Sequence, residues 1–131
     1  MAQRPPDGSD PSLSDAHSLA RAAQAMRCLP FRRGFYERVS QQPLGSEAFC
    51  QLPEAPRLCW GQMGPDRVEA HFIWLIRLGV LRREVDGQGL TERVRLTPMG
   101  RDLLARWPGA IPRAGLAERL QHQLRRSRPR L

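Results

Sequence analysis

Residues 67–104 read RVEAHFIWLIRLGVLRREVDGQGLTERVRLTPMGRDLL, and this stretch decides the fold. Its first part places apolar side chains at helical spacing, which predicts a helix over 66–78. Glycine tolerates the left-handed conformation that commonly ends a helix, so Gly79 marks the C-terminal end. On a helical wheel, one stripe about 100° wide is apolar and should face the core. It consists of Val68, Phe72, Leu75 and Ile76.

Two predicted strands follow this helix. Residues 81–86 and 92–97 carry the β-branched and apolar positions, and Asp-Gly-Gln-Gly lies between them as a turn. A further helix is expected after Thr97, because threonine is a good N-cap and proline is favoured at the first helical position. The order helix, two-stranded ribbon, helix predicts a mainly α fold with a small β-hairpin, of the α+β class.

Two segments carry a family resemblance. Residues 75–83, LIRLGVLRR, are similar to the end of the recognition helix and the entry to the wing in bacterial winged helix-turn-helix regulators. Residues 96–104, LTPMGRDLL, resemble the closing segment "LTPxGrxLL" of those proteins. The overall pattern also resembles small cyanobacterial winged-helix proteins of unassigned function. The resemblance implies a recognition helix over 66–78 and a wing over 81–97.

The flanking sequence predicts an organisation in three parts. Residues 1–12 hold three prolines and no apolar period, so they should form a disordered arm. Residues 13–110 should form the winged-helix domain, with an extra N-terminal helix over 13–29, further helices over 31–42 and 46–52, and a long loop over 53–65. Residues 111–131 should form an amphipathic helix that continues into a basic tail. The apolar stripe of that helix is Leu116, Leu120 and Leu124.

The charge is strongly positive and unevenly placed. The formal net charge is +8, and all 21 basic residues are arginine. Residues 111–131 contribute +5 of it, including the tail arginines Arg125, Arg126, Arg128 and Arg130. Basic arms bind nucleic acid without reading its sequence. The absence of lysine and asparagine is also typical of a GC-rich genome, in which case the tail is merely a solvated end.

The predicted recognition helix exposes a face that could meet DNA. That face offers Arg67, His71, Trp74 and Arg77, and arginine can contact guanine in a bidentate way. Trp74 fits a protein interface better than a DNA groove, or packs against the long loop or the N-terminal helix. In the wing, arginines that could straddle phosphates are interleaved with three acids and could instead pair with them. These wing arginines are Arg82, Arg83, Arg93 and Arg95.

No pattern in the sequence indicates an enzyme. There is no glycine-rich phosphate loop and no nucleophile elbow, and no cofactor is expected. Cys50, Cys59 and His71 have spacings that match no familiar zinc site. The three cysteines, Cys28, Cys50 and Cys59, cannot all pair and should be free thiols. No apolar run is long enough to span a membrane, which favours a cytoplasmic protein.

Two functions therefore remain open from the sequence. The first is a DNA-binding transcriptional regulator, dimeric through its flanking helices 13–29 and 116–124. The second is a winged-helix protein-interaction module that uses the face around Trp74 and does not bind DNA specifically.

Overall fold

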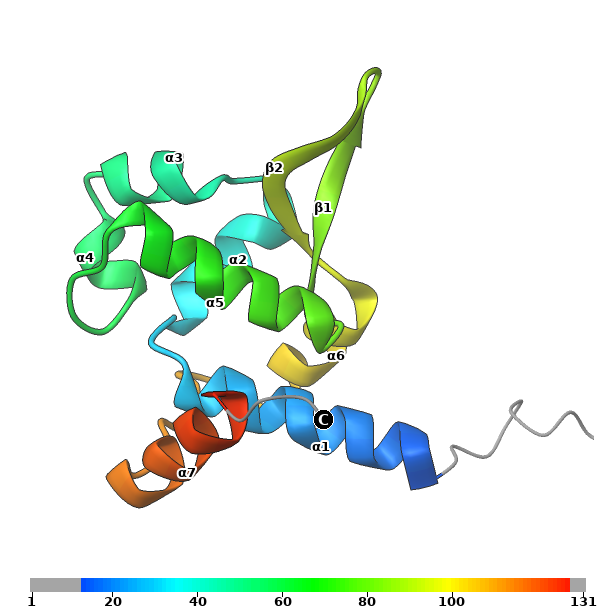
Figure 1. Ribbon diagram of the computed structural model, residues 1–131, viewed down its shortest axis with the longest axis vertical. Helices are drawn as coiled ribbons and strands as arrows, with labels where there is room; N and C mark the ends of the chain where they lie inside the picture. Colours follow the sequence, from blue (N-terminus) through cyan, green and yellow to red (C-terminus); the bar gives the residue numbers. More distant parts are fainter. Residues whose placement is uncertain (1–12, 128–131) are drawn as a thin grey trace, which may run out of the picture.

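The computed structural model describes residues 13–127, and the predicted arm 1–12 and the tail residues Arg128 and Arg130 lie outside them. Within this part the chain is mainly helical with one antiparallel hairpin, which confirms the expected α+β class (Figure 1). The elements are α1 (Leu13–Cys28), α2 (Arg33–Gln41), α3 (Ser46–Gln51), α4 (Ala55–Leu58), α5 (Pro65–Arg77), β1 (Leu81–Asp86), β2 (Gly89–Leu96), α6 (Pro98–Ala105) and α7 (Leu116–Ser127).

An aromatic cluster forms the centre of the core. Phe31 and Phe35 stack with their ring centroids 4.2 Å apart, and Phe35 stacks on Phe72 of α5 at 5.7 Å. Offset and edge-to-face aromatic pairs add to the gain from burial alone. The predicted inward stripe of α5 is confirmed at Val68, Phe72 and Leu75, which are fully buried, whereas Ile76 is half-buried. The helix that was predicted to begin at residue 66 begins at Pro65, one residue earlier.

The hairpin is longer than the sequence indicates. Leu81 pairs with Leu96 and Asp86 with Gly89, so the turn has only two residues and β2 begins three residues before the predicted Glu92. Gly89 makes this possible, because its φ of +117° is a conformation that other residues avoid. The segment before α3 joins the ribbon through Leu44, whose N–H and C=O both bond to Val94 at 3.2 and 3.0 Å. The hairpin is thereby fastened to the helices.

The predicted start of α6 is confirmed in detail. The Thr97 hydroxyl accepts a hydrogen bond from the backbone N–H of Gly100 at 3.0 Å, and Pro98 occupies the first helical position. Gly79 has φ +86°, as expected for the residue that ends α5. Gly100 lies so close to the end of α5 that a Cβ there would stand 2.7 Å from the Val80 carbonyl oxygen.

Helix α1 packs on α6 and α7, at the end of the molecule opposite the hairpin (Figure 1). The predicted loop 53–65 contains the short helix α4, and a bridge between Phe31 and Cys59 fastens it to the core. Cys28, Cys50 and Cys59 are all free thiols. Among residues 13–127 no helix is long and apolar enough to cross a membrane. In the same range no three His, Cys, Asp or Glu side chains gather to hold a metal ion.

Candidate functional site

The outer face of α5 is the predicted recognition surface, and part of it is covered. Arg67 and Arg77 are exposed near its two ends, as expected. His71 is only 8% exposed, so the prediction that it faces solvent is wrong. Trp74 is half-buried, which agrees with the alternative that it packs within the protein. The physical reason is α7, which folds back against the middle of this face.

Three hydrogen bonds join α7 to α5. The indole Nε1–H of Trp74 donates to His122 Nε2 at 3.2 Å. The Arg126 guanidinium donates to His71 Nδ1 at 2.8 Å and to the Ala70 carbonyl oxygen at 3.0 Å. The same guanidinium lies 5.5 Å from the centre of the Trp74 ring, within reach of a cation–π interaction. Trp74 therefore packs against α7, a contact that the sequence did not indicate.

The surroundings of both histidines at this junction favour the neutral form. Burial, together with Arg126, Arg67 and His122, lowers the pKa of His71 to about 4. Burial and the nearby arginines Arg126 and Arg125 also lower the pKa of His122, against a smaller opposite effect of Glu118. A neutral ring has one nitrogen free to accept, which fits the bond that each histidine receives.

Helix α7 also binds α1 through polar side chains. Glu118 accepts from the Arg27 guanidinium at 3.0 Å, and Arg125 donates to the Gln24 side-chain oxygen at 3.1 Å. The inner face of α7 is thus polar. Its predicted apolar stripe points outward, with Leu116, Leu120 and Leu124 exposed by 64%, 57% and 71%. An exposed row of leucines on one helix is a candidate interaction surface.

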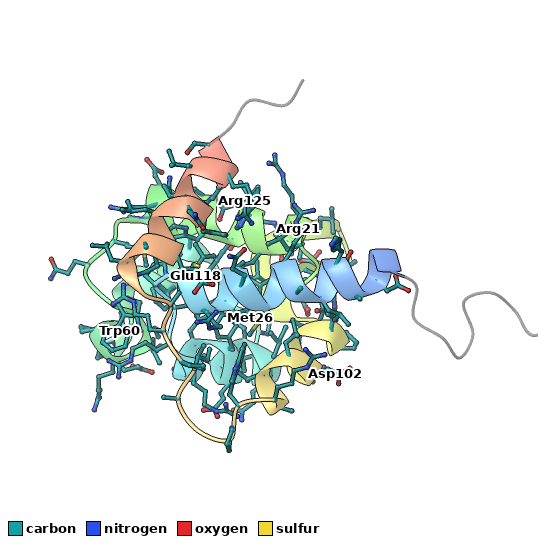
Figure 2. The ribbon with its side chains drawn as sticks, turned by 90° about the horizontal axis from the view of Figure 1, so that it is seen from below. Arg21, Met26, Trp60, Asp102, Glu118 and Arg125 are labelled. Carbon is teal, nitrogen blue, oxygen red and sulfur yellow. The ribbon has the colours of Figure 1, made fainter. Side chains whose placement is uncertain are left out.

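A groove of about 960 Å³ opens where α1, α5 and α7 meet. Four guanidiniums line it, and we call it the arginine groove. Figure 2 shows Arg21 of α1 and Arg125 of α7 on the two sides of the gap, with α5 behind them. The lining residues are Ser18, Arg21, Trp74, Arg77, Leu78, Arg125 and Arg126.

The positive charge of the arginine groove is uncompensated. No carboxylate lines it, and within residues 13–127 none of its four arginines forms an ion pair. Burial, and to a smaller extent the like charges of Arg67 and Arg77, lowers the pKa of Arg126. A groove of this kind attracts anions.

The wing arginines are mostly engaged within the protein. Arg83 pairs with Glu69 of α5 and also donates to the Glu92 carbonyl oxygen at 2.8 Å. The Arg95–Glu84 ion pair measures 2.6 Å and the Arg93–Asp86 pair 3.9 Å. Arg82 is exposed, and its side chain forms no ion pair among the described residues. Most wing arginines therefore pair with carboxylates of the ribbon or of α5. This agrees with the interpretation in which the wing arginines pair with nearby acids instead of straddling phosphates.

The structure brings together residues that the sequence kept apart. Arg77 and Trp74 were assigned to the recognition helix, and Arg125 and Arg126 to a separate basic tail, yet all four line one groove. Arg21 was not a candidate at all. The one local signal is the polar face of α7, where Glu118 and His122 lie one helical turn apart and opposite the leucines, and it does not indicate which helix that face contacts.

The fold and site together define a small, mainly helical protein with a β-hairpin and a strongly positive groove. Residues 12–126 match the family described as Npun_F0494-like, and the chain therefore belongs to that family. The family description names no activity. Comparison with curated proteins and with solved structures gave no match.

Proposed function

We propose that this protein is a cytoplasmic, winged helix-turn-helix regulator of transcription that binds double-stranded DNA. The order α5, hairpin, α6 supports the winged-helix assignment, as does the way Leu44 fastens the ribbon to the helices through Val94. The observation that carries the proposal is the arginine groove, with four guanidiniums from three helices that form no ion pair within residues 13–127. Duplex DNA supplies closely spaced phosphates, and neutralising them provides much of the affinity of DNA-binding proteins.

Base reading would be restricted while α7 is docked. His71 and Trp74 are covered and cannot reach base edges, whereas Arg67 and Arg77 are exposed. These two arginines would read guanine, with Arg82 and the three other groove arginines on the phosphates. If α7 stays docked when the protein binds DNA, we therefore expect strong binding to phosphates and modest sequence selectivity.

The test is fluorescence anisotropy with random-sequence duplex DNA at about 50 and 200 mM salt. If Arg82 and the three groove arginines other than Arg77 meet phosphates, the slope of log K against log salt should be about −3 to −4. Arg21→Ala and Arg125→Ala should each reduce its magnitude by about 1. The matched control is Arg106→Ala, an exposed arginine with no partner among the described residues and outside the groove. Equal loss for Arg106→Ala and the groove variants would refute the site.

Selectivity is tested separately with duplexes enriched from the random pool. Arg67→Ala and Arg77→Ala should lower the preference for the enriched sequence over the random pool, at about 1–3 kcal/mol for each lost guanine contact. Unchanged preference in both variants would leave the protein as a DNA binder that does not read sequence through α5.

The proposal includes a homodimer formed through the outward face of α7. In an antiparallel pair of α7 helices, Leu120 would meet its own copy and Leu116 would meet Leu124 of the second copy. Two-fold symmetry suits a regulator, because dimers bind two half-sites a helical turn apart. Light scattering should show a dimer that Leu120→Gln dissociates and that Gln121→Ala, an exposed neighbour, does not. A wild-type monomer at high concentration would contradict it.

The alternative is a protein-interaction module that uses the face around Trp74 and does not bind DNA specifically. The polar attachment of α7 favours it, because a partner helix could replace α7 on Trp74 by exchanging a few hydrogen bonds. The DNA titration separates the two functions. Absence of salt-dependent duplex binding would support the interaction module, and Trp74→Ala would then be expected to abolish partner binding.

A further inference from the structure

We propose that a second, smaller pocket binds a small aromatic anion, a carboxylate or phosphate carried on a ring. The pocket has a volume of about 230 Å³ and lies between the C-terminal part of α1, the turn into α2, α4 and the segment 110–113. It shares no lining residue with the arginine groove. The inference therefore does not depend on DNA binding.

The inner wall of this pocket is apolar. Met26 and Phe31 are each 1% exposed and Leu29 is 4% exposed, so they belong to the hydrophobic core. Ligand sites are typically apolar cavities with a few polar groups that fix the orientation of the ligand. A volume of this size holds one ring with a short substituent.

The mouth of the pocket is positive. Arg32 and Arg113 both lie over the indole of Trp60, at 4.0 and 4.8 Å from the ring centre. Together with Arg57 they form no ion pair among the described residues, and no carboxylate lines the pocket. Stacking on an aromatic ring orders a guanidinium while its N–H groups stay free to donate. This is the chemistry that holds an anionic group at the mouth of an apolar pocket.

Two further arginines fix the walls. The Arg33 guanidinium donates to the carbonyl oxygens of Trp107 and Gly109 at 2.8 and 2.9 Å. Arg27 donates to the Pro112 carbonyl oxygen at 3.1 Å. The segment that carries Arg113 is thus fastened to α1 and α2. Figure 2 shows it running beside Trp60 on its way to α7.

Three probes of graded chemistry test the site on the full chain. Benzoate has both ring and charge, benzyl alcohol has the ring alone and acetate has the charge alone. Binding is followed by the indole N–H signals of Trp60, Trp74 and Trp107 in NMR titrations, with Trp60→Phe for assignment. Benzoate should shift the Trp60 signal and bind about ten-fold or more tightly than benzyl alcohol, since a charge-assisted hydrogen bond contributes that much. It should also bind more tightly than acetate, because acetate has no ring to bury.

Matched variants show whether the mouth arginines are responsible. Arg113→Gln and Arg32→Gln should each weaken benzoate binding about ten-fold. Arg106→Gln removes the same charge from an exposed position outside the pocket and should have no effect. The proposal is overturned if benzoate and benzyl alcohol bind equally, if neither binds, or if Arg106→Gln weakens binding as much as Arg113→Gln. It is also overturned if benzoate shifts Trp74 instead of Trp60, which would place the anion in the arginine groove.

Discussion

Acidification should destabilise this protein through one buried side chain, His71. Its pKa is lowered to about 4 in the folded state, from an ordinary value of 6.5. The unfolded chain therefore binds a proton more readily than the folded chain between these two values. The contribution of the neutral His71 side chain to the free energy of unfolding is therefore complete above pH 6.5 and is lost as the pH falls toward 4.

The magnitude follows from the two pKa values. Protonation of the unfolded chain at pH 5 lowers the free energy of unfolding by about 2 kcal/mol relative to pH 7, and by about 3 kcal/mol at pH 4 or below. A domain of this size is stable by roughly 5–15 kcal/mol, so the effect is a large fraction of the total. Burial of His122 also lowers its pKa, which adds a loss in the same direction.

The assay is urea unfolding at pH 7 and at pH 5, followed by far-UV circular dichroism. His71→Leu has no proton to bind, so the change between the two pH values should be about 2 kcal/mol smaller than in the wild type. His17→Leu, at an exposed position on α1, is the control and should change as the wild type does. An identical pH dependence in His71→Leu and wild type would refute the assignment of the acid sensitivity to His71.

Three further predictions concern stability and are measured by urea unfolding at pH 7. Gly100→Ala should lower the free energy of unfolding by about 1–3 kcal/mol, because the new Cβ would stand 2.6 Å from Leu96 Cδ1 and 2.7 Å from the Val80 carbonyl oxygen. The control is Gly109→Ala, which should change stability little because no atom lies within 4 Å of its Cβ. Thr97→Ala should cost about 1–2 kcal/mol through loss of the α6 cap, and an unchanged value would contradict that role. Arg33→Ala should lower the free energy of unfolding by about 1–2 kcal/mol, because the carbonyl groups of Trp107 and Gly109 lose their hydrogen-bond donor. The control Arg106→Ala should stay within about 0.5 kcal/mol of wild type.

The segment from α5 to α6 could be predicted because its signals are local. Thr97 and Pro98 begin α6, and Gly79 ends α5, through the backbone preferences of those residue types alone. The inward stripe of α5 follows from helical periodicity and needs no knowledge of the rest of the chain. The start of β2 was missed because Gly89 served equally well as a turn residue and as the first residue of a strand.

The position of α7 could not be predicted, because its contacts join residues far apart in sequence. Glu118 meets Arg27 across 91 residues, and His122 meets Trp74 across 48. No local pattern in the sequence indicates that these side chains contact one another. The periodicity showed which face of α7 is apolar, but that face is not the one that packs on the domain. The burial of His71 depends on the same contacts and was missed for the same reason.

These contacts also decide how the basic C-terminal segment should be tested. A chain that ends at Ala110 would lose Arg125 and Arg126 and, in the same step, uncover His71 and Trp74 on α5. Reduced DNA binding could then reflect lost phosphate contacts, and retained binding could reflect a newly exposed recognition surface. Arg125→Ala removes a groove guanidinium that, among the described residues, bonds to the Gln24 side chain, and it leaves the bonds from α7 to α5 in place. That single substitution separates the charge of α7 from its role as a cover, which a truncation cannot do.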